Sequence, residues 1–160
     1  MYTWFLVAAI ASPSGISDEL KVDSGYEAAL VVPATGVQIY ECAEKDGKFG
    51  WQFKGPEATL YDDKRSGVIG KHYGGPTWEA SDGSKVKGAL KARQDAPAGN
   101  IPWLLLTTTT EGAGRFAGVA FIQRVNTSGG IAPKSSCDKA MSGKVERVDY
   151  KADYYLYRKK

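Results

Sequence analysis

The chain has 160 residues, enough for one domain with a hydrophobic core of its own and no need of metal staples. Hydrophobic residues make up 42% of it and charged residues 24%, which is ordinary for a globular protein and excludes an intrinsically disordered chain. The formal net charge is only +3 and no run of five basic residues occurs, so a nucleic-acid-binding protein is not expected.

The N-terminus carries an apolar run, WFLVAAIA, over residues 4–11, followed by the sequence SPSG. The run is too short for a transmembrane helix, which needs about 20 residues. Ala9-Ile10-Ala11 has the small-x-small pattern that signal peptidase cleaves, although no basic segment precedes the run. We therefore interpret residues 1–18 as a signal-peptide remnant or an N-terminal strand, and residues 19–160 as the domain. The favoured localisation is periplasmic or secreted.

From residue 26 onward the pattern is that of β-strands, with apolar and polar residues in alternation. The strand-like segments are YEAALVV (26–32), VQIYECA (37–43), FGWQF (49–53), EATLYD (57–62), VIGKHYG (68–74), SKVKGALKAR (84–93), WLLLTTTT (103–110), RFAGVAFIQRVNT (115–127) and VERVDYKADYYLYR (145–158). Turn sequences rich in glycine and proline separate them, and no segment has a convincing helical period. The pattern predicts an all-β fold, a single-domain antiparallel β-sandwich or barrel.

The chain has two cysteines, Cys42 at the end of a strand-like segment and Cys137 in a polar loop. No histidine lies beside either of them and no C-x-x-C occurs, so neither a metal site nor a redox motif is predicted. In an oxidising compartment a disulfide between Cys42 and Cys137 is the natural pairing. Two separate buried thiols are the alternative.

Several motifs follow one another in the order and wording of the DUF3455 family, which this chain resembles. They are GVQIYEC, W-x-FKGPEA-x-LYD, IGKHYGGPTWEASDGSKV, IPWLLL, FAGVAFIQRVNTSGGIAP and ADYYLY, and they run from about Gly36 to Tyr157. Members of that family look like exported bacterial and some fungal proteins of unknown function. The resemblance implies export and a single domain, but it implies no activity.

The most informative segment for function is GKHYGGPTWEASDGSKVKG, residues 70–88, because it holds the only histidine of the chain. His72 lies close in sequence to Trp78 and Glu79, and an imidazole near a carboxylate could perform acid-base catalysis. An enzyme that uses His72 with Glu79 is one hypothesis. Strand geometry disfavours it, since successive side chains point to opposite faces of a sheet.

Binding is the favoured hypothesis. Aromatic side chains such as Tyr40 and Trp78 offer flat apolar area with a polar tip, which suits a sugar or another small molecule. Arg124 follows an apolar strand, and a guanidinium buried there needs an anionic partner from the protein or from a ligand. The predicted ligand site comprises His72, Trp78, Glu79 and Arg124, with Tyr40 and Gln38 next.

Two alternatives stay open at this point. The aromatic residues can belong to an ordinary core, with Arg124 paired to Glu79 or Asp82 to hold the turn between them. The protein can also bind an envelope partner and no small ligand. No cofactor, metal, nucleic acid or transmembrane segment is expected under any of these hypotheses.

Overall fold

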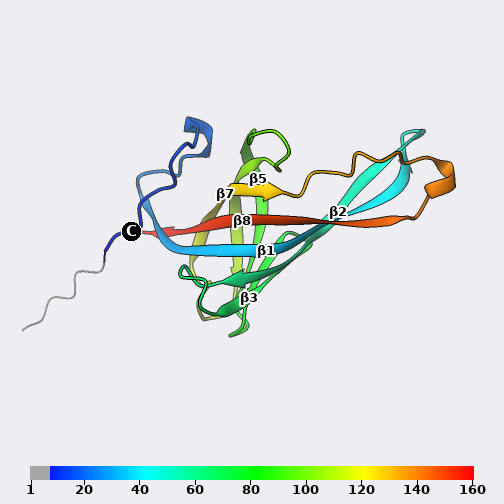
Figure 1. Ribbon diagram of the computed structural model, residues 1–160. Coiled ribbons are helices and arrows are strands. Elements are labelled where there is room, and N and C mark those ends of the chain that lie inside the picture. Colours follow the sequence, from blue (N-terminus) through cyan, green and yellow to red (C-terminus); the bar gives the residue numbers. More distant parts are fainter. Residues whose placement is uncertain (1–7) are drawn as a thin grey trace, which may run out of the picture.

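The computed structural model describes residues 8–160, and these form a single sheet of antiparallel strands (Figure 1). The strands are β1 (Tyr26–Lys45), β2 (Lys48–Tyr61), β3 (Val68–Tyr73), β4 (Thr77–Ala80), β5 (Lys85–Gln94), β6 (Trp103–Glu111), β7 (Val119–Gly129) and β8 (Val145–Lys159). Each strand pairs with the next, and β8 pairs with β1, which closes the sheet into a barrel. The prediction of an all-β, single-domain sandwich or barrel is confirmed.

Regular helix is confined to two short 3-10 turns in the described part of the chain, η1 (Asp18–Leu20) and η2 (Lys139–Met141). Accordingly, no helix between residues 8 and 160 has the length and apolar character needed to span a membrane. The fold is built from strands, and most of the residues with positive φ lie in the turns that join them.

The hairpin of β1 and β2 extends well beyond the barrel, beside the connection that contains η2 (Figure 1). A disulfide between Cys42 and Cys137 joins β1 to this connection. Next to it, the indole nitrogen of Trp51 donates to the carbonyl oxygen of Ser135 at 2.9 Å. The predicted pairing of the two cysteines is therefore present, and it holds together two segments that are 95 residues apart.

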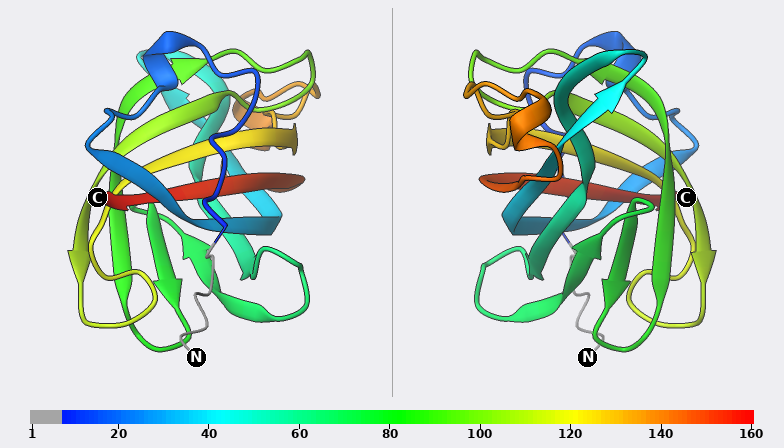
Figure 2. Two further views of the ribbon diagram at one scale, coloured as in Figure 1. Left: turned by 90° about the vertical axis from the view of Figure 1, so that its left-hand side faces the viewer. Right: turned by 90° about the vertical axis from the view of Figure 1, so that its right-hand side faces the viewer.

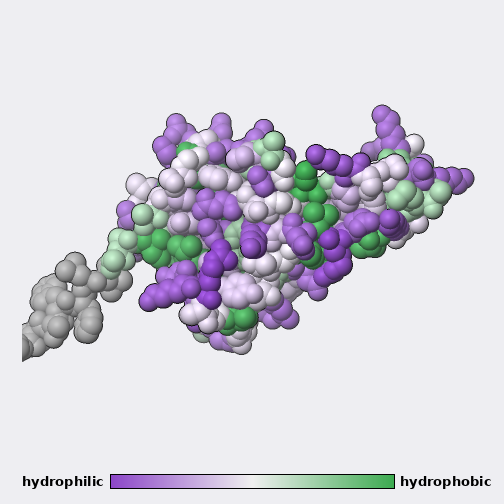
Figure 3. Space-filling view, in the orientation of Figure 1, coloured by the Kyte–Doolittle hydropathy of each residue, from purple (hydrophilic) through white to green (hydrophobic). Residues whose placement is uncertain are grey.

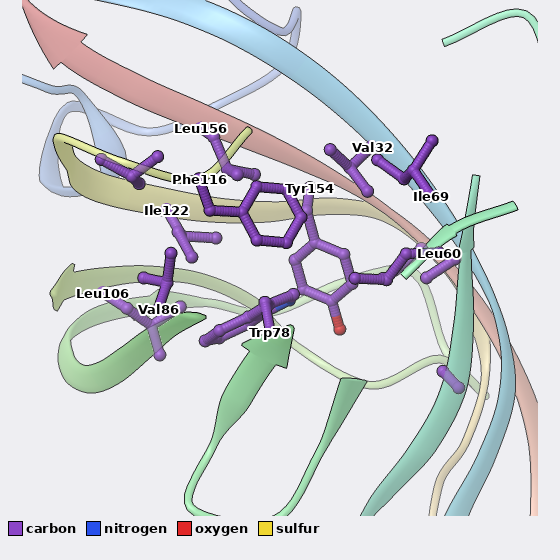
Figure 4. Close-up of a cluster of buried hydrophobic side chains, with 14 of the residues drawn as sticks. Val32, Leu60, Ile69, Trp78, Val86, Leu106, Phe116, Ile122, Tyr154 and Leu156 are labelled. Atoms are coloured by element: carbon purple, nitrogen blue, oxygen red, sulfur yellow. The ribbon is translucent and has the colours of Figure 1, made fainter. Parts of the chain in front are cut away.

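The barrel interior is filled by residues of alternate positions, as expected for strands that bury one face. Trp78, Tyr150 and Tyr154 are the largest fully buried side chains there. Smaller apolar residues such as Leu60, Val86 and Ile122 lie around Trp78 and Tyr154 (Figure 4). The strands come very close together at Gly36, where a Cβ atom would lie 2.2 Å from the carbonyl oxygen of Glu57. Only glycine permits this approach of β1 to β2.

The segment before β1 packs against the outside of the barrel, where its chain crosses the strands (Figure 2, left). Leu20 is fully buried, and its carbonyl oxygen accepts a hydrogen bond of 2.7 Å from Gln123. Gln94 fixes the same segment by accepting from the backbone N–H of Ser17 and donating to the carbonyl of Gly15. The segment is thus packed on the barrel on both sides of the expected boundary between residues 18 and 19. Residues 1–7, which hold much of the apolar run, lie outside the described part, so the signal peptide stays a prediction.

On the face seen in Figure 3, apolar residues gather in small areas that polar residues separate.

Candidate functional site

A cavity of about 220 Å³ lies among inward-facing residues of β1, β2, β3, β4, β6, β7 and β8, and we call it the barrel cavity. It is larger than an apolar cavity of roughly 150 Å³ that binds benzene. Four of the six residues of the predicted ligand site line this cavity, namely Gln38, His72, Trp78 and Arg124. Leu104, Leu106 and Tyr154 line it from β6 and β8, and residues 53–56 of β2 and 74–76 of the turn between β3 and β4 complete the wall.

Three aromatic rings form one wall of the barrel cavity. His72 on β3 and Trp78 on β4 are directly opposite each other in the sheet, so their side chains share a face. Their rings stack with centroids 4.3 Å apart and an interplanar angle of 17°. Tyr154 packs edge-on against both of them, at 5.2 Å from His72 and 5.4 Å from Trp78. Figure 4 shows Trp78 and Tyr154 of this aromatic wall.

The imidazole of His72 is neutral near physiological pH. Its side chain is only 4% exposed, and this burial lowers the pKa of His72 to about 3, although a hydrogen bond to Thr77 opposes the change. The positive charge of Arg124 adds to the lowering of that pKa. Nδ1 lies 2.8 Å from the carbonyl oxygen of Thr77, which can only accept, so Nδ1 carries the hydrogen. Nε2 is left as a hydrogen-bond acceptor.

Arg124 brings a positive charge to the cavity wall. It lies on β7 directly opposite Leu104 on β6 and Tyr154 on β8, which places all three on the inner face of the sheet. Its Nε and Nη2 atoms both donate to the carbonyl oxygen of Pro102, at 3.0 and 2.7 Å. Within residues 8–160, no carboxylate oxygen lies within 4.0 Å of this half-buried guanidinium.

The expected alternative, an ion pair of Arg124 with Glu79 or Asp82, is therefore not formed. Asp82 instead accepts hydrogen bonds from the backbone and the hydroxyl of Ser84 and from the backbone N–H of Arg115. These bonds lower the pKa of Asp82 to about 2 and fix the turn after β4 without help from Arg124.

Two buried hydrogen-bond donors at the cavity have no partner. The amide nitrogen of Gln38 and the indole nitrogen of Trp78 are inaccessible to solvent, and neither finds an acceptor in the described part of the chain. The two side chains are 3% and 1% exposed. Buried polar groups are nearly always hydrogen-bonded in folded proteins, and leaving one unpaired costs about 1 to 3 kcal/mol. Both side chains also line the barrel cavity, so their unsatisfied donors lie in its wall.

Glu79 lies outside the barrel cavity. It sits opposite Lys71 and Lys85 on the outer face of the sheet, with lysine nitrogens 3.4 and 3.3 Å from its carboxylate oxygens. The hydroxyl of Tyr73 donates to it at 3.0 Å, and this bond is the main reason why the pKa of Glu79 is lowered. The structure therefore does not bring Glu79 to His72, and the acid-base pair considered from the sequence is not assembled.

Tyr40 lies beside the barrel cavity, in a shallower adjoining groove of about 380 Å³. Its hydroxyl donates to the carbonyl oxygen of Gly130 at 2.6 Å, and its ring packs against Phe53. Gln38 and Arg124 line both hollows and so stand where one opens into the other. The part of the chain described here has no group of three or more His, Cys, Asp or Glu side chains placed to hold a metal ion.

A family model described as "Protein of unknown function (DUF3455)" matches residues 23–158, nearly the whole chain. The chain belongs to the DUF3455 family. No curated protein and no solved structure matches it. Every residue that lines the barrel cavity falls inside the matched region, so the cavity is part of the DUF3455 domain.

Sequence reasoning missed Leu104, Leu106 and Tyr154. Tyr154 lies in the tyrosine-rich segment ADYYLY, where strand alternation alone could have separated it from Tyr155, which lies on the other face. β6, β7 and β8 follow one another in the chain and pair in that order, so an arrangement in which consecutive strands pair would have placed Leu104 and Tyr154 beside Arg124. The order of the strands in the sheet, and not a local sequence motif, is therefore what identifies these wall residues.

Proposed function

We propose that this protein is an exported binding protein that holds one small molecule with a flat apolar body in the barrel cavity. The observation that carries the proposal is the pair of buried donors without partners, on Gln38 and Trp78, beside the unpaired charge of Arg124. Ligand pockets typically combine apolar walls with a few such polar groups, which fix orientation.

The chemistry of the wall favours binding over acid-base catalysis. A general acid or base works best with a pKa near the operating pH, whereas the pKa of His72 is lowered to about 3. Glu79 is engaged by two lysines on the opposite face of the sheet. His72 is better suited to bind, with its ring as part of the aromatic wall and Nε2 as an acceptor.

The composition of the wall favours an apolar ring over a carbohydrate. A sugar carries a hydroxyl on nearly every carbon and needs many polar partners, whereas the cavity wall offers few polar groups between Trp78, Leu104 and Leu106. The stacked rings of His72 and Trp78 favour a planar ligand that packs against them.

The disulfide supports export. Disulfides persist in the periplasm and outside the cell and are rare where thiols are kept reduced. The Cys42–Cys137 bond joins the projecting hairpin to the η2 connection. A periplasmic or secreted location therefore forms part of the proposal.

Thermal unfolding with neutral single-ring compounds, such as benzyl alcohol and benzamide, tests the proposed cavity. We expect at least one of them to raise the melting temperature, since a ligand at about 100 times its Kd adds roughly 2.7 kcal/mol. The variant Leu104→Trp fills the cavity from its wall and should abolish the effect. Glu79→Gln lies on the outer face and should keep it.

The proposal is wrong if no compound shifts the wild-type protein, or if the cavity-filled variant responds as strongly as the wild type. Leu106→Phe serves as the second filled variant if Leu104→Trp does not fold, because Leu106 lines the same cavity from the same strand. Circular dichroism of each variant shows whether the sheet has formed.

A further inference from the structure

We propose that the ligand is a small organic acid, whose carboxylate binds Arg124 while its apolar body occupies the barrel cavity. This inference rests on the proposed function and adds the chemical class of the ligand. It assigns to Arg124 the role of the residue that selects a carboxylate over a neutral group.

The first argument is the geometry of the guanidinium. Arginine has five N–H groups, and two of them, on Nε and Nη2, donate to the carbonyl oxygen of Pro102. Even if one more is assigned to the nearby hydroxyl of Tyr154, whose pKa is raised by burial and only partly lowered again by the guanidinium, two N–H groups remain. A carboxylate accepts charge-assisted hydrogen bonds of this kind, which are stronger than bonds between neutral groups.

The second argument is charge. The residues that line the barrel cavity and the adjoining groove include three basic ones, Lys54, Arg93 and Arg124, and no Asp or Glu. Lys54 lies 3.8 Å from Glu41, and Arg93 lies 3.7 Å from Asp95, so each has a carboxylate partner. Arg124 is the one of the three without such a partner in residues 8–160. A half-buried cation without a counter-ion favours an anion beside it.

The third argument is the match of donors. The unpartnered N–H group of Gln38 needs an acceptor, and a carboxylate offers only acceptors. The carboxylate would lie on the side of Gln38 and Arg124, because the lone pair of His72 Nε2 repels an anion. Gln38 and Arg124 line both hollows, so the acid group would lie where they meet, with the body of the ligand directed towards Trp78.

The size of the cavity limits the body of the acid. About 220 Å³ suits a single aromatic ring or a short branched chain, and the stacked rings of His72 and Trp78 favour the aromatic ring. The proposed class is therefore small aromatic and branched aliphatic monocarboxylates. Longer acids would extend into the groove over Tyr40 and Phe53.

Calorimetric titration with matched acid and amide pairs tests this inference. The pairs are benzoate with benzamide, phenylacetate with phenylacetamide, and 3-methylbutanoate with 3-methylbutanamide, each with nearly the same shape and a different charge. We expect the wild-type protein to bind the acid of at least one pair about tenfold or more tighter than its amide, as charge-assisted hydrogen bonds allow. The preference should weaken as salt is added.

The decisive variant is Arg124→Met, which keeps the length of the side chain and removes the guanidinium. It should lose the preference for the acid and still bind the amide. Arg158→Met is the matched control, since Arg158 is also a half-buried arginine that donates to two backbone carbonyls, of Ala117 and Arg115, but lies outside the cavity. It should keep the preference. Arg124→Gln is the second variant if Arg124→Met does not fold.

The possible failures are distinct. If acid and amide bind the wild-type protein equally, or if Arg124→Met keeps the preference for the acid, the inference is wrong while the cavity remains a binding site. If no acid and no amide binds and the neutral rings of the previous section fail as well, the proposed function itself is wrong.

Discussion

Replacing His72 tests the environment of the barrel cavity without any ligand. His72 is the only histidine of the chain, and burial lowers its pKa from 6.5 to about 3. Below pH 6.5 the unfolded chain binds a proton that the folded chain refuses, so the free energy of unfolding falls as the pH falls. Between about pH 7.5 and pH 4.5, we expect a loss of about 2 to 3 kcal/mol of unfolding free energy from this residue alone. For a chain of this length that is a decrease in melting temperature of about 5 to 10 °C.

The assay is urea unfolding of the wild type and of His72→Asn at both pH values. Asparagine can still donate to the carbonyl oxygen of Thr77, and it does not titrate in this range. All other groups titrate alike in both proteins. The difference between the two proteins in how the free energy of unfolding depends on pH is therefore due to His72. The reasoning is refuted if the two proteins lose the same free energy of unfolding between these pH values. That outcome would place a solvated imidazole at position 72 and remove one side of the aromatic wall.

Two further predictions concern the frame around the site. The double variant Cys42→Ala, Cys137→Ala should lose about 4.7 kcal/mol of unfolding free energy, because the disulfide closes a loop of 95 residues in the unfolded chain. Equal urea midpoints for this variant and the wild type would contradict the estimate. Gly36→Ala should lose at least about 2 kcal/mol, since the new methyl group would collide with the backbone at Glu57. Gly25→Ala meets no atom within 4 Å and should unfold like the wild type; equal losses in both variants would show that crowding at Gly36 is not the cause.

The fold was largely predictable because strand alternation is a local property. The nine strand-like segments correspond to seven of the eight strands, because the segments over residues 26–32 and 37–43 are joined into β1 and those over residues 49–53 and 57–62 into β2, and the short β4 was left unpredicted. The joining has a physical reason, since the bulge where β1 pairs with β2 between Ile39 and Tyr40 lets the pairing continue past Gly55 and Pro56. Closure of the sheet depends on the pairing of β1 with β8, which no local pattern reveals.

The candidate site was predictable only in part, for a related reason. The placement of Trp78 and Glu79 on opposite faces follows from alternation, and the structure shows Trp78 inside and Glu79 outside. That Arg124 lies across the barrel from His72 and Trp78 depends on the whole closed sheet. His72, the single histidine of the chain, and Arg124, which follows an apolar strand, were recognisable as candidate functional residues. The sequence did not indicate where their side chains lie relative to each other.

The unpaired donors at the cavity and the nearby disulfide have opposite effects on stability, and this contrast suggests how this small barrel tolerates its cavity. Two unpaired donors cost about 2 to 6 kcal/mol together, which is a large part of the stability of an ordinary domain. The disulfide at Cys42 contributes a comparable amount, and it lies only two positions along β1 from Tyr40, at the edge of the groove. A constraint on the unfolded chain does not fill the cavity or satisfy its donors, so it stabilises the fold and leaves the site able to receive a ligand. Polar groups that fit poorly in a core are expected where a protein functions, and here they meet at Gln38, Trp78 and Arg124.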